Sequence, residues 1–97
     1  MNLNVAIVGA ARMGRERARS AKALGAEISF IFDPDVKRRN ALAVQYEARA
    51  VDTVDEVDMR KVDAVFVCTP PSSRASVELH AIRADVTVFV EKPIGLP

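Results

Sequence analysis

The 97-residue sequence has no tryptophan, only 5% aromatic residues, a single cysteine and a formal net charge of +1. With so few aromatic rings to stack on bases and so little excess positive charge to attract a polyanion, we expect no nucleic-acid partner. The lone Cys68 cannot form an internal disulfide, and no group of Cys and His residues has the spacing of a zinc site. We therefore expect a metal-free domain in a reducing compartment, the cytoplasm.

Long hydrophobic runs are also missing. No apolar stretch approaches the ~20 residues that cross a bilayer, and no basic segment with an apolar run behind it precedes the first strand-like segment. We expect no membrane association and no export signal. The 49% of apolar and 28% of charged residues are typical of a globular chain, and the length suits one domain.

Short β-branched segments alternate along the chain with longer helical ones. The short segments are almost wholly apolar, as expected for parallel strands that are covered on both faces. We predict strands at residues 5–8, 28–32, 64–68 and 87–90, with a weaker edge strand at 49–51. This alternation, with right-handed crossovers, predicts a doubly wound parallel α/β sheet of about five strands.

Four helices are predicted between these strands, each from a local signal. The first, at 13–24, has a face of small residues that can approach a sheet closely, and the second runs from Pro34 in its first turn to Tyr46. Thr53 and Glu56 match a capping box, in which each side chain satisfies the other residue's backbone N–H, and start a short helix ending near residue 60. Ser72 or Ser73 caps the last helix.

The first predicted strand runs into a glycine-rich segment, Gly9-Ala-Ala-Arg-Met-Gly14. It matches the dinucleotide-binding fingerprint with alanine, Ala11, in place of the middle glycine. In that fingerprint the first glycine makes a tight turn, the middle position lets the backbone approach a pyrophosphate, and the third allows close packing of helix on strand. The N–H groups of Arg12 and Met13 are expected to meet the phosphates at the positive end of the helix dipole.

Asp33 ends the second predicted strand, nineteen positions after Gly14. An acidic side chain at that place accepts hydrogen bonds from the adenosine ribose hydroxyls and repels a 2′-phosphate, so NAD is favoured over NADP. The basic run of Lys37, Arg38 and Arg39 follows closely and weakens this preference. S-adenosylmethionine or another adenosine ligand stays an alternative, because the same carboxylate can bind any ribose.

Two motifs in the second half make the sequence more specific. Thr69-Pro70 follows the fourth predicted strand and Glu91-Lys92-Pro93 follows the fifth. Together with the Gly-x-x-Arg-Met-Gly segment they resemble the glucose–fructose oxidoreductase and inositol dehydrogenase (Gfo/Idh/MocA) family over essentially the whole chain. The resemblance implies the N-terminal dinucleotide-binding domain of an NAD(P)-dependent oxidoreductase that acts on a hydroxyl of a sugar, a cyclitol or a similar small molecule.

The resemblance also implies roles for individual residues. Thr69 and Pro70 are expected to wall the nicotinamide ribose, and Glu91 to orient the cofactor. Lys92 is expected beside the carbon that exchanges hydride, where its ammonium can stabilise developing charge on the substrate oxygen or assist a proton acceptor. The chain departs from the family at Arg74, where a histidine is common, and at Asp85, where glycine is common.

The chain also falls short of the family in length. By the resemblance we expect residues 1–97 to form the dinucleotide-binding domain and to lack the family's second domain, which supplies most of the substrate pocket. We therefore expect dinucleotide binding with little turnover. The alternative is a non-catalytic binding or assembly module that pairs with itself or with a partner chain through the exposed edge of the fifth strand.

Overall fold

The computed structural model describes residues 3–53, 56–68 and 86–90. Five parallel strands form one sheet in the order β3-β2-β1-β4-β5. The elements, in chain order, are β1 (Asn4–Val8), α1 (Arg12–Ala23), β2 (Glu27–Phe32), α2 (Val36–Tyr46), β3 (Arg49–Val51), the 3₁₀ helix η2 (Met59–Lys61), β4 (Ala64–Val67) and β5 (Thr87–Val90). This is the predicted doubly wound sheet, with the 49–51 strand at one edge as expected.

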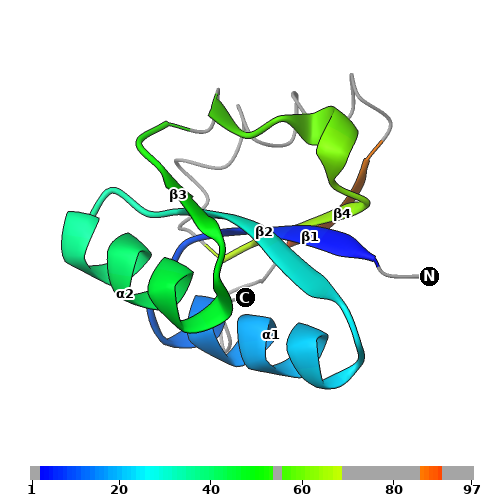
Figure 1. Cartoon of the computed structure of the whole chain (residues 1–97), viewed down its shortest axis with the longest axis horizontal. Coiled ribbons are helices and arrows are strands. Elements are labelled where there is room, and N and C mark those ends of the chain that lie inside the picture. The colour runs from blue at the N-terminus through cyan, green and yellow to red at the C-terminus, as the bar shows by residue number, and fades with distance from the viewer. Residues whose placement is uncertain (1–2, 54–55, 69–85, 91–97) are drawn as a thin grey trace, which may run out of the picture.

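The sheet separates two hydrophobic cores, because successive strand residues point to opposite faces. In β1, Val5 and Ile7 pack with α1 and α2, whereas Ala6 and Val8 pack on the other face with residues of η2. Figure 1 shows α1 and α2 side by side beneath the sheet and the short η2 above it. Burial on both faces explains why the strands could be recognised as continuous apolar runs.

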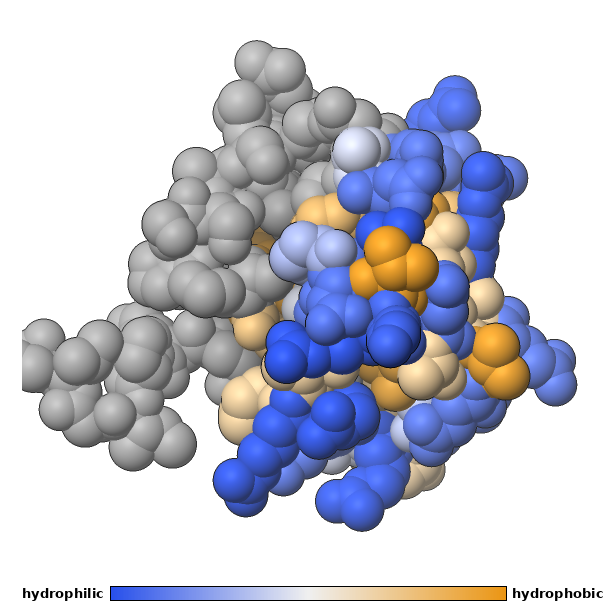
Figure 2. Space-filling view, turned by 90° about the vertical axis from the view of Figure 1, so that its left-hand side faces the viewer, coloured by the Kyte–Doolittle hydropathy of each residue, from blue (hydrophilic) through white to orange (hydrophobic). Residues whose placement is uncertain are grey.

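The helix α1 packs on the sheet through the small residues that the sequence singled out. Gly14, Ala18 and Ala21 are all buried. The helix begins and ends one residue earlier than predicted, and Leu24, at its C-terminal cap, is 89% exposed. The outer side of α2 is more hydrophilic than the buried face of α1. Figure 2, which faces this side, shows mostly hydrophilic side chains with isolated hydrophobic ones among them.

Other local details also differ from the sequence-based expectations. Pro34 precedes α2 rather than lying in its first turn, because Asp35 is the N-terminal cap. The Glu56 carboxylate accepts from the N–H of Asp52 at 2.9 Å, not from that of Thr53, so the predicted reciprocal capping box does not form. The pairing of β1 with β2 shifts by one residue, because Val5 pairs with Ile28 whereas Ala6 pairs with Phe30. No sequence pattern predicted this shift.

The helix predicted after Ser72 or Ser73 lies outside the described residues. Within the part of the chain that the structure describes, no helix has both the length and the apolar character needed to cross a membrane.

Candidate functional site

The glycine loop, residues 9–14, joins the end of β1 to the start of α1. Gly9 has a φ of 102°, which residues with a side chain rarely adopt, and its N–H donates to the carbonyl of Phe32 at 2.7 Å. A Cβ atom on Gly14 would lie 1.7 Å from the carbonyl oxygen of Gly9. The backbone itself therefore requires both glycines, one for the turn and the other for the close approach of helix to strand.

The N-terminus of α1 is open to an anion. Ala11 is its N-terminal cap and makes no side-chain capping hydrogen bond, and its exposed side chain leaves the helix end accessible. The first-turn N–H groups, including those of Arg12 and the half-buried Met13, have no acceptor within the helix. At α2, by contrast, the Asp35 carboxylate accepts from the N–H groups of residues 37 and 38. Of these two helices, α1 has the N-terminus suited to a phosphate.

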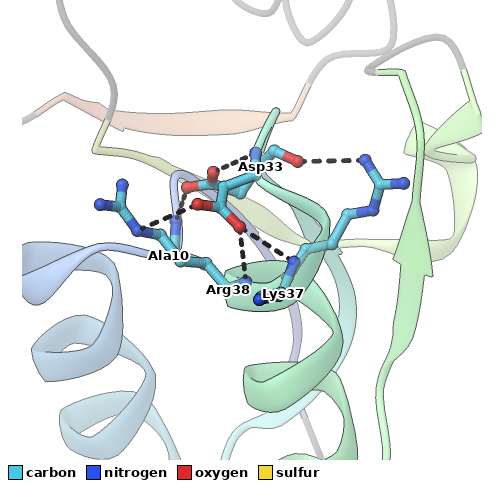
Figure 3. A network of polar contacts seen from close by, with 6 residues as sticks. Ala10, Asp33, Lys37 and Arg38 are labelled. Atoms are coloured by element: carbon cyan, nitrogen blue, oxygen red, sulfur yellow. Dashed lines mark hydrogen bonds and ion pairs between the residues drawn. The ribbon is translucent and has the colours of Figure 1, made fainter.

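Asp33 lies between the two helix starts and is 5% exposed. Its Oδ2 accepts from the N–H of Ala10 at 2.6 Å, and its Oδ1 accepts from the N–H of Asp35 at 2.8 Å. Figure 3 shows this carboxylate between the glycine loop and the start of α2. Asp33 thus stands at the end of β2, where the sequence predicted it, but its carboxylate is already engaged by the backbone.

Two arginine side chains near the site form ion pairs with acidic neighbours. The Arg12 guanidinium lies 3.4 Å from the Glu16 carboxylate, and that of Arg38 lies 3.8 Å from the Asp35 carboxylate, both at exposed positions. Exposed pairs of this kind are weak, so either arginine can exchange its partner for a ligand phosphate at little cost. The structure brings Arg12 to the glycine loop and Arg38 to the first turn of α2.

Arg39 is a residue of this region for which the sequence gave no specific role. Its Nη1 donates to the carbonyl of Asp33 at 3.2 Å, and its Nη2 forms an ion pair with Asp52, just after β3. The side chain is only 12% exposed. Within the basic run 37–39, periodicity alone could have indicated it, because residue 39 precedes the buried Leu42 and Ala43 by one helical turn.

The ends of β4 and β5 complete the carboxyl edge of the described sheet. Val8, Val67 and Val90 are register partners across β1, β4 and β5, so these three strands end side by side. Cys68, just after β4, continues the hydrogen bonding to β1, because its N–H donates to the carbonyl of Val8 at 2.7 Å. The predicted site residues that follow these two strands, Thr69, Pro70, Glu91 and Lys92, lie outside the described residues.

Comparison with known proteins identifies the family. Residues 3–97 match the model of the Gfo/Idh/MocA oxidoreductase family, described as having an NAD-binding Rossmann fold. The chain is 29% identical to UDP-N-acetylglucosamine 3-dehydrogenase of Acidithiobacillus ferrooxidans, over 99% of this chain and 30% of the relative.

Two solved structures agree with this match. The myo-inositol dehydrogenase of Corynebacterium glutamicum superposes with a TM-score of 0.87 at 30% identity, over 97% of this chain and 29% of that one. GenD2 from gentamicin A biosynthesis, solved in complex with NAD, gives 0.86 at 31% identity, over 96% and 27%. This chain thus spans less than a third of each of these proteins. It belongs to the Gfo/Idh/MocA oxidoreductase family and has the NAD-binding Rossmann fold of that family.

Proposed function

We propose that this chain is the cofactor-binding portion of an NAD(P)-dependent oxidoreductase that acts on a hydroxyl-bearing carbon of a sugar, a cyclitol or a similar small molecule. The observation that carries the proposal is the uncapped N-terminus of α1, which lies beside the buried Asp33 in a family member. The substrate class is supported by the names of two relatives, a UDP-N-acetylglucosamine 3-dehydrogenase and a myo-inositol dehydrogenase.

The residues fit a dinucleotide for physical reasons. The missing Cβ at Gly14 lets α1 start against the strand end, so its positive end faces the place where a pyrophosphate lies in such folds. Asp33 is the acidic residue near the adenosine ribose, and its charge disfavours a 2′-phosphate. Arg39, whose side chain is only 12% exposed, is held by the Asp33 carbonyl and by Asp52, which supports NAD over NADP as the preferred cofactor.

In the proposed reaction the nicotinamide, when bound, supplies the hydride acceptor. Thr69 and Pro70 wall its ribose and Glu91 orients it, as the family resemblance implies. Lys92, which lies outside the described residues, is the proposed catalytic residue: by the resemblance its ammonium would lie beside the reacting carbon, where it would stabilise negative charge on the substrate oxygen or assist the acceptor of the alcohol's proton. Placement in the cytoplasm suits this chemistry and the single cysteine.

Much of the substrate site belongs to a second domain that we propose is not part of these 97 residues. The chain spans only 30% of the UDP-N-acetylglucosamine dehydrogenase and 29% of the myo-inositol dehydrogenase. We therefore expect the purified chain to bind the dinucleotide with little or no turnover. Oxidation of myo-inositol by the 97-residue chain at an ordinary dehydrogenase rate, about 1 per second or faster, contradicts this part of the proposal.

Titration with NADH, NADPH and S-adenosylmethionine tests the cofactor assignment. Under one set of conditions, calorimetry is expected to show binding of NADH, weaker binding of NADPH and none of S-adenosylmethionine. Binding of S-adenosylmethionine alone overturns the assignment. Equal affinities for NADH and NADPH contradict the argument that the charge of Asp33 disfavours NADP.

Substitution Ala11→Asp separates loss of binding from loss of fold. An aspartate at the N-terminal cap of α1 satisfies first-turn N–H groups and stabilises the folded chain by about 1 kcal/mol. The same carboxylate occupies those donors and repels a pyrophosphate, so NADH affinity falls about tenfold or more. The expected result is a higher unfolding midpoint with weaker binding, and unchanged NADH affinity in a stabilised variant excludes α1 as the phosphate site.

A second candidate function, assembly through the edge of β5, rests on a different observation. Phe89 is 50% exposed and stacks on Phe66, with ring centroids 5.0 Å apart, on the last strand of the described sheet. The two rings border a hollow of about 290 Å³ that also contains Leu3 and Leu24, which are 57% and 89% exposed. An unpaired edge beside apolar side chains favours association with another chain.

Light scattering on the purified chain tests this candidate. Assembly through β5 predicts a dimer that Phe89→Lys converts to a monomer, because the charge must otherwise be buried at the interface. The matched control is Val44→Lys on α2, at a position 79% exposed, which leaves the dimer intact. A monomer at all concentrations excludes self-association through β5.

A further inference from the structure

Asp33 is unusual among the described residues because it is the one charged or polar residue that is buried. A carboxylate removed from water needs hydrogen-bond partners in the protein. Among the described residues, the Asp33 carboxylate has two such partners, the N–H groups of Ala10 at 2.6 Å and of Asp35 at 2.8 Å, one on each carboxylate oxygen (Figure 3). Both donors are backbone groups, so these contacts exist without any ligand.

The two donors belong to different loops. Ala10 is the second residue of the glycine loop after β1, and Asp35 caps α2 after β2. A single carboxylate therefore joins the loop that faces the pyrophosphate to the loop that faces the ribose. Because Ala10 is itself 2% exposed, its N–H has little access to water as a replacement acceptor.

Arg39 extends this connection to a third strand. Its guanidinium donates to the Asp33 carbonyl at 3.2 Å and pairs with Asp52, which follows β3. Ala10, Asp33, Arg39 and Asp52 thus form a continuous polar chain along the carboxyl ends of β1, β2 and β3. We call these four residues the loop brace.

We infer that Asp33 acts as a positioning residue, whose carboxylate fixes the glycine loop in its binding conformation before a dinucleotide arrives, and that Arg39 supports it. This inference rests on the proposed function. A carboxylate has about four lone-pair sites, so accepting two backbone N–H groups leaves capacity for a ribose hydroxyl as well. A loop that is already ordered costs less free energy on binding, and this contribution is separate from any contact that Asp33 makes with the ligand.

The first experiment measures the loop without cofactor. Amide exchange by NMR in the cofactor-free chain is expected to accelerate about tenfold at Ala10 in Asp33→Asn, because the neutral asparagine oxygen is a weaker acceptor than a carboxylate oxygen for either N–H group. The matched control is Asp63→Asn, which alters an exposed aspartate that accepts from the N–H of Asn4 at 2.8 Å and leaves Ala10 unchanged. Unchanged exchange at Ala10 in Asp33→Asn overturns the inference.

The second experiment separates positioning from ribose contact. NADH affinity is compared with that of an NADH analogue that lacks the 2′ and 3′ hydroxyls of the adenosine ribose. Positioning predicts that Asp33→Asn weakens both ligands, by about tenfold each. A loss seen with NADH but absent with the analogue assigns Asp33 to ribose contact alone and overturns the inference.

Arg39→Gln provides a variant that keeps the buried carboxylate, in case Asp33→Asn does not fold. Its amide can still donate to the Asp33 carbonyl but no longer forms an ion pair, so both ligands are expected to weaken by about threefold. Full affinity for both ligands in Arg39→Gln removes Arg39 from the brace. If the unmodified chain binds neither ligand, the proposed function fails, whereas amide exchange at Ala10 still decides whether Asp33 fixes the loop.

Discussion

The two ends of β1 are held by the same chemical contact in different surroundings. At the carboxyl end, Asp33 accepts from the N–H of Ala10 and is 5% exposed. At the amino end, Asp63 accepts from the N–H of Asn4 at an exposed position. A hydrogen bond from a backbone N–H to an aspartate therefore contributes more to stability where water is excluded, because water can replace the acceptor only at the exposed end.

Glycine shows the same contrast between the two edges. Gly14, at the carboxyl edge, has the Gly9 carbonyl where its Cβ would be, whereas Gly25, which precedes β2 at the amino edge, has nothing within 4 Å of that position. Space at the amino edge is open, and only the φ of 93° at Gly25 restricts the residue type there. Of the two glycines, the one with no room for a Cβ atom thus lies at the edge where we propose that the cofactor binds.

The largest expected effect comes from Gly14→Ala. A methyl group 1.7 Å from a backbone oxygen cannot be accommodated without moving α1, and we expect a loss of about 3 kcal/mol in the free energy of unfolding. Gly25→Ala, the control, is limited to the cost of a left-handed alanine, about 1 kcal/mol. Denaturation by urea measures both variants, and equal losses contradict the tight approach of α1 to β1.

An intermediate effect is expected from removing the two aspartates. Asp33→Ala leaves a buried N–H at Ala10 without an acceptor, which costs about 2 kcal/mol of the unfolding free energy. Asp63→Ala leaves the N–H of Asn4 to water and costs about 0.5 kcal/mol or less. Thermal unfolding of the two variants side by side gives the ratio, and similar losses would mean that burial is not what distinguishes the two ends.

The smallest effect concerns Asp58, whose side chain is 29% exposed, on the segment that leads into β4. A side-chain hydrogen bond from Arg60, and then one from its backbone N–H, hold the pKa of the Asp58 carboxyl below its ordinary value of 3.8. A lowered pKa in the folded state means that the stabilisation is present above about pH 4 and is lost as the pH falls through the folded pKa. NMR titration of Arg60→Ala is expected to show the Asp58 pKa rising toward 3.8, and an unchanged pKa rejects the Arg60 side chain as the main cause.

Strand positions were predictable because burial on both faces leaves a continuous apolar run in the sequence. The predicted strand at 28–32 differs from β2 only in its first residue, and the predicted edge strand coincides with β3. The register shift between Val5 and Ala6 was not predictable, since it arises from how two distant strands fit each other. Local signals also failed where a competing donor was available: the Glu56 carboxylate accepts from the N–H of Asp52 instead of that of Thr53.

For the candidate site, the positions of residues were predictable from the sequence, whereas their contacts were not. The positions of Gly9, Gly14 and Asp33 followed from spacing, because the fingerprint specifies a turn, a close approach and an acidic strand end. The contact from Asp33 to Ala10 joins residues 23 positions apart, and no periodicity encodes it. Arg39 stands among three consecutive basic residues. Its spacing from Leu42 and Ala43 indicates that it faces inward, but only the packed structure decides that it contacts Asp33 and Asp52.

The sequence by itself determined the order of strands and helices, the turn at Gly9 and the family to which the chain belongs, because these depend on residue type and on short-range spacing. Only the tertiary structure decided that the Asp33 carboxylate is buried and holds the glycine loop, and that the equivalent contact of Asp63 stays in water. The physical reason is that solvent exclusion is a property of the packed molecule, and it sets what a hydrogen bond contributes.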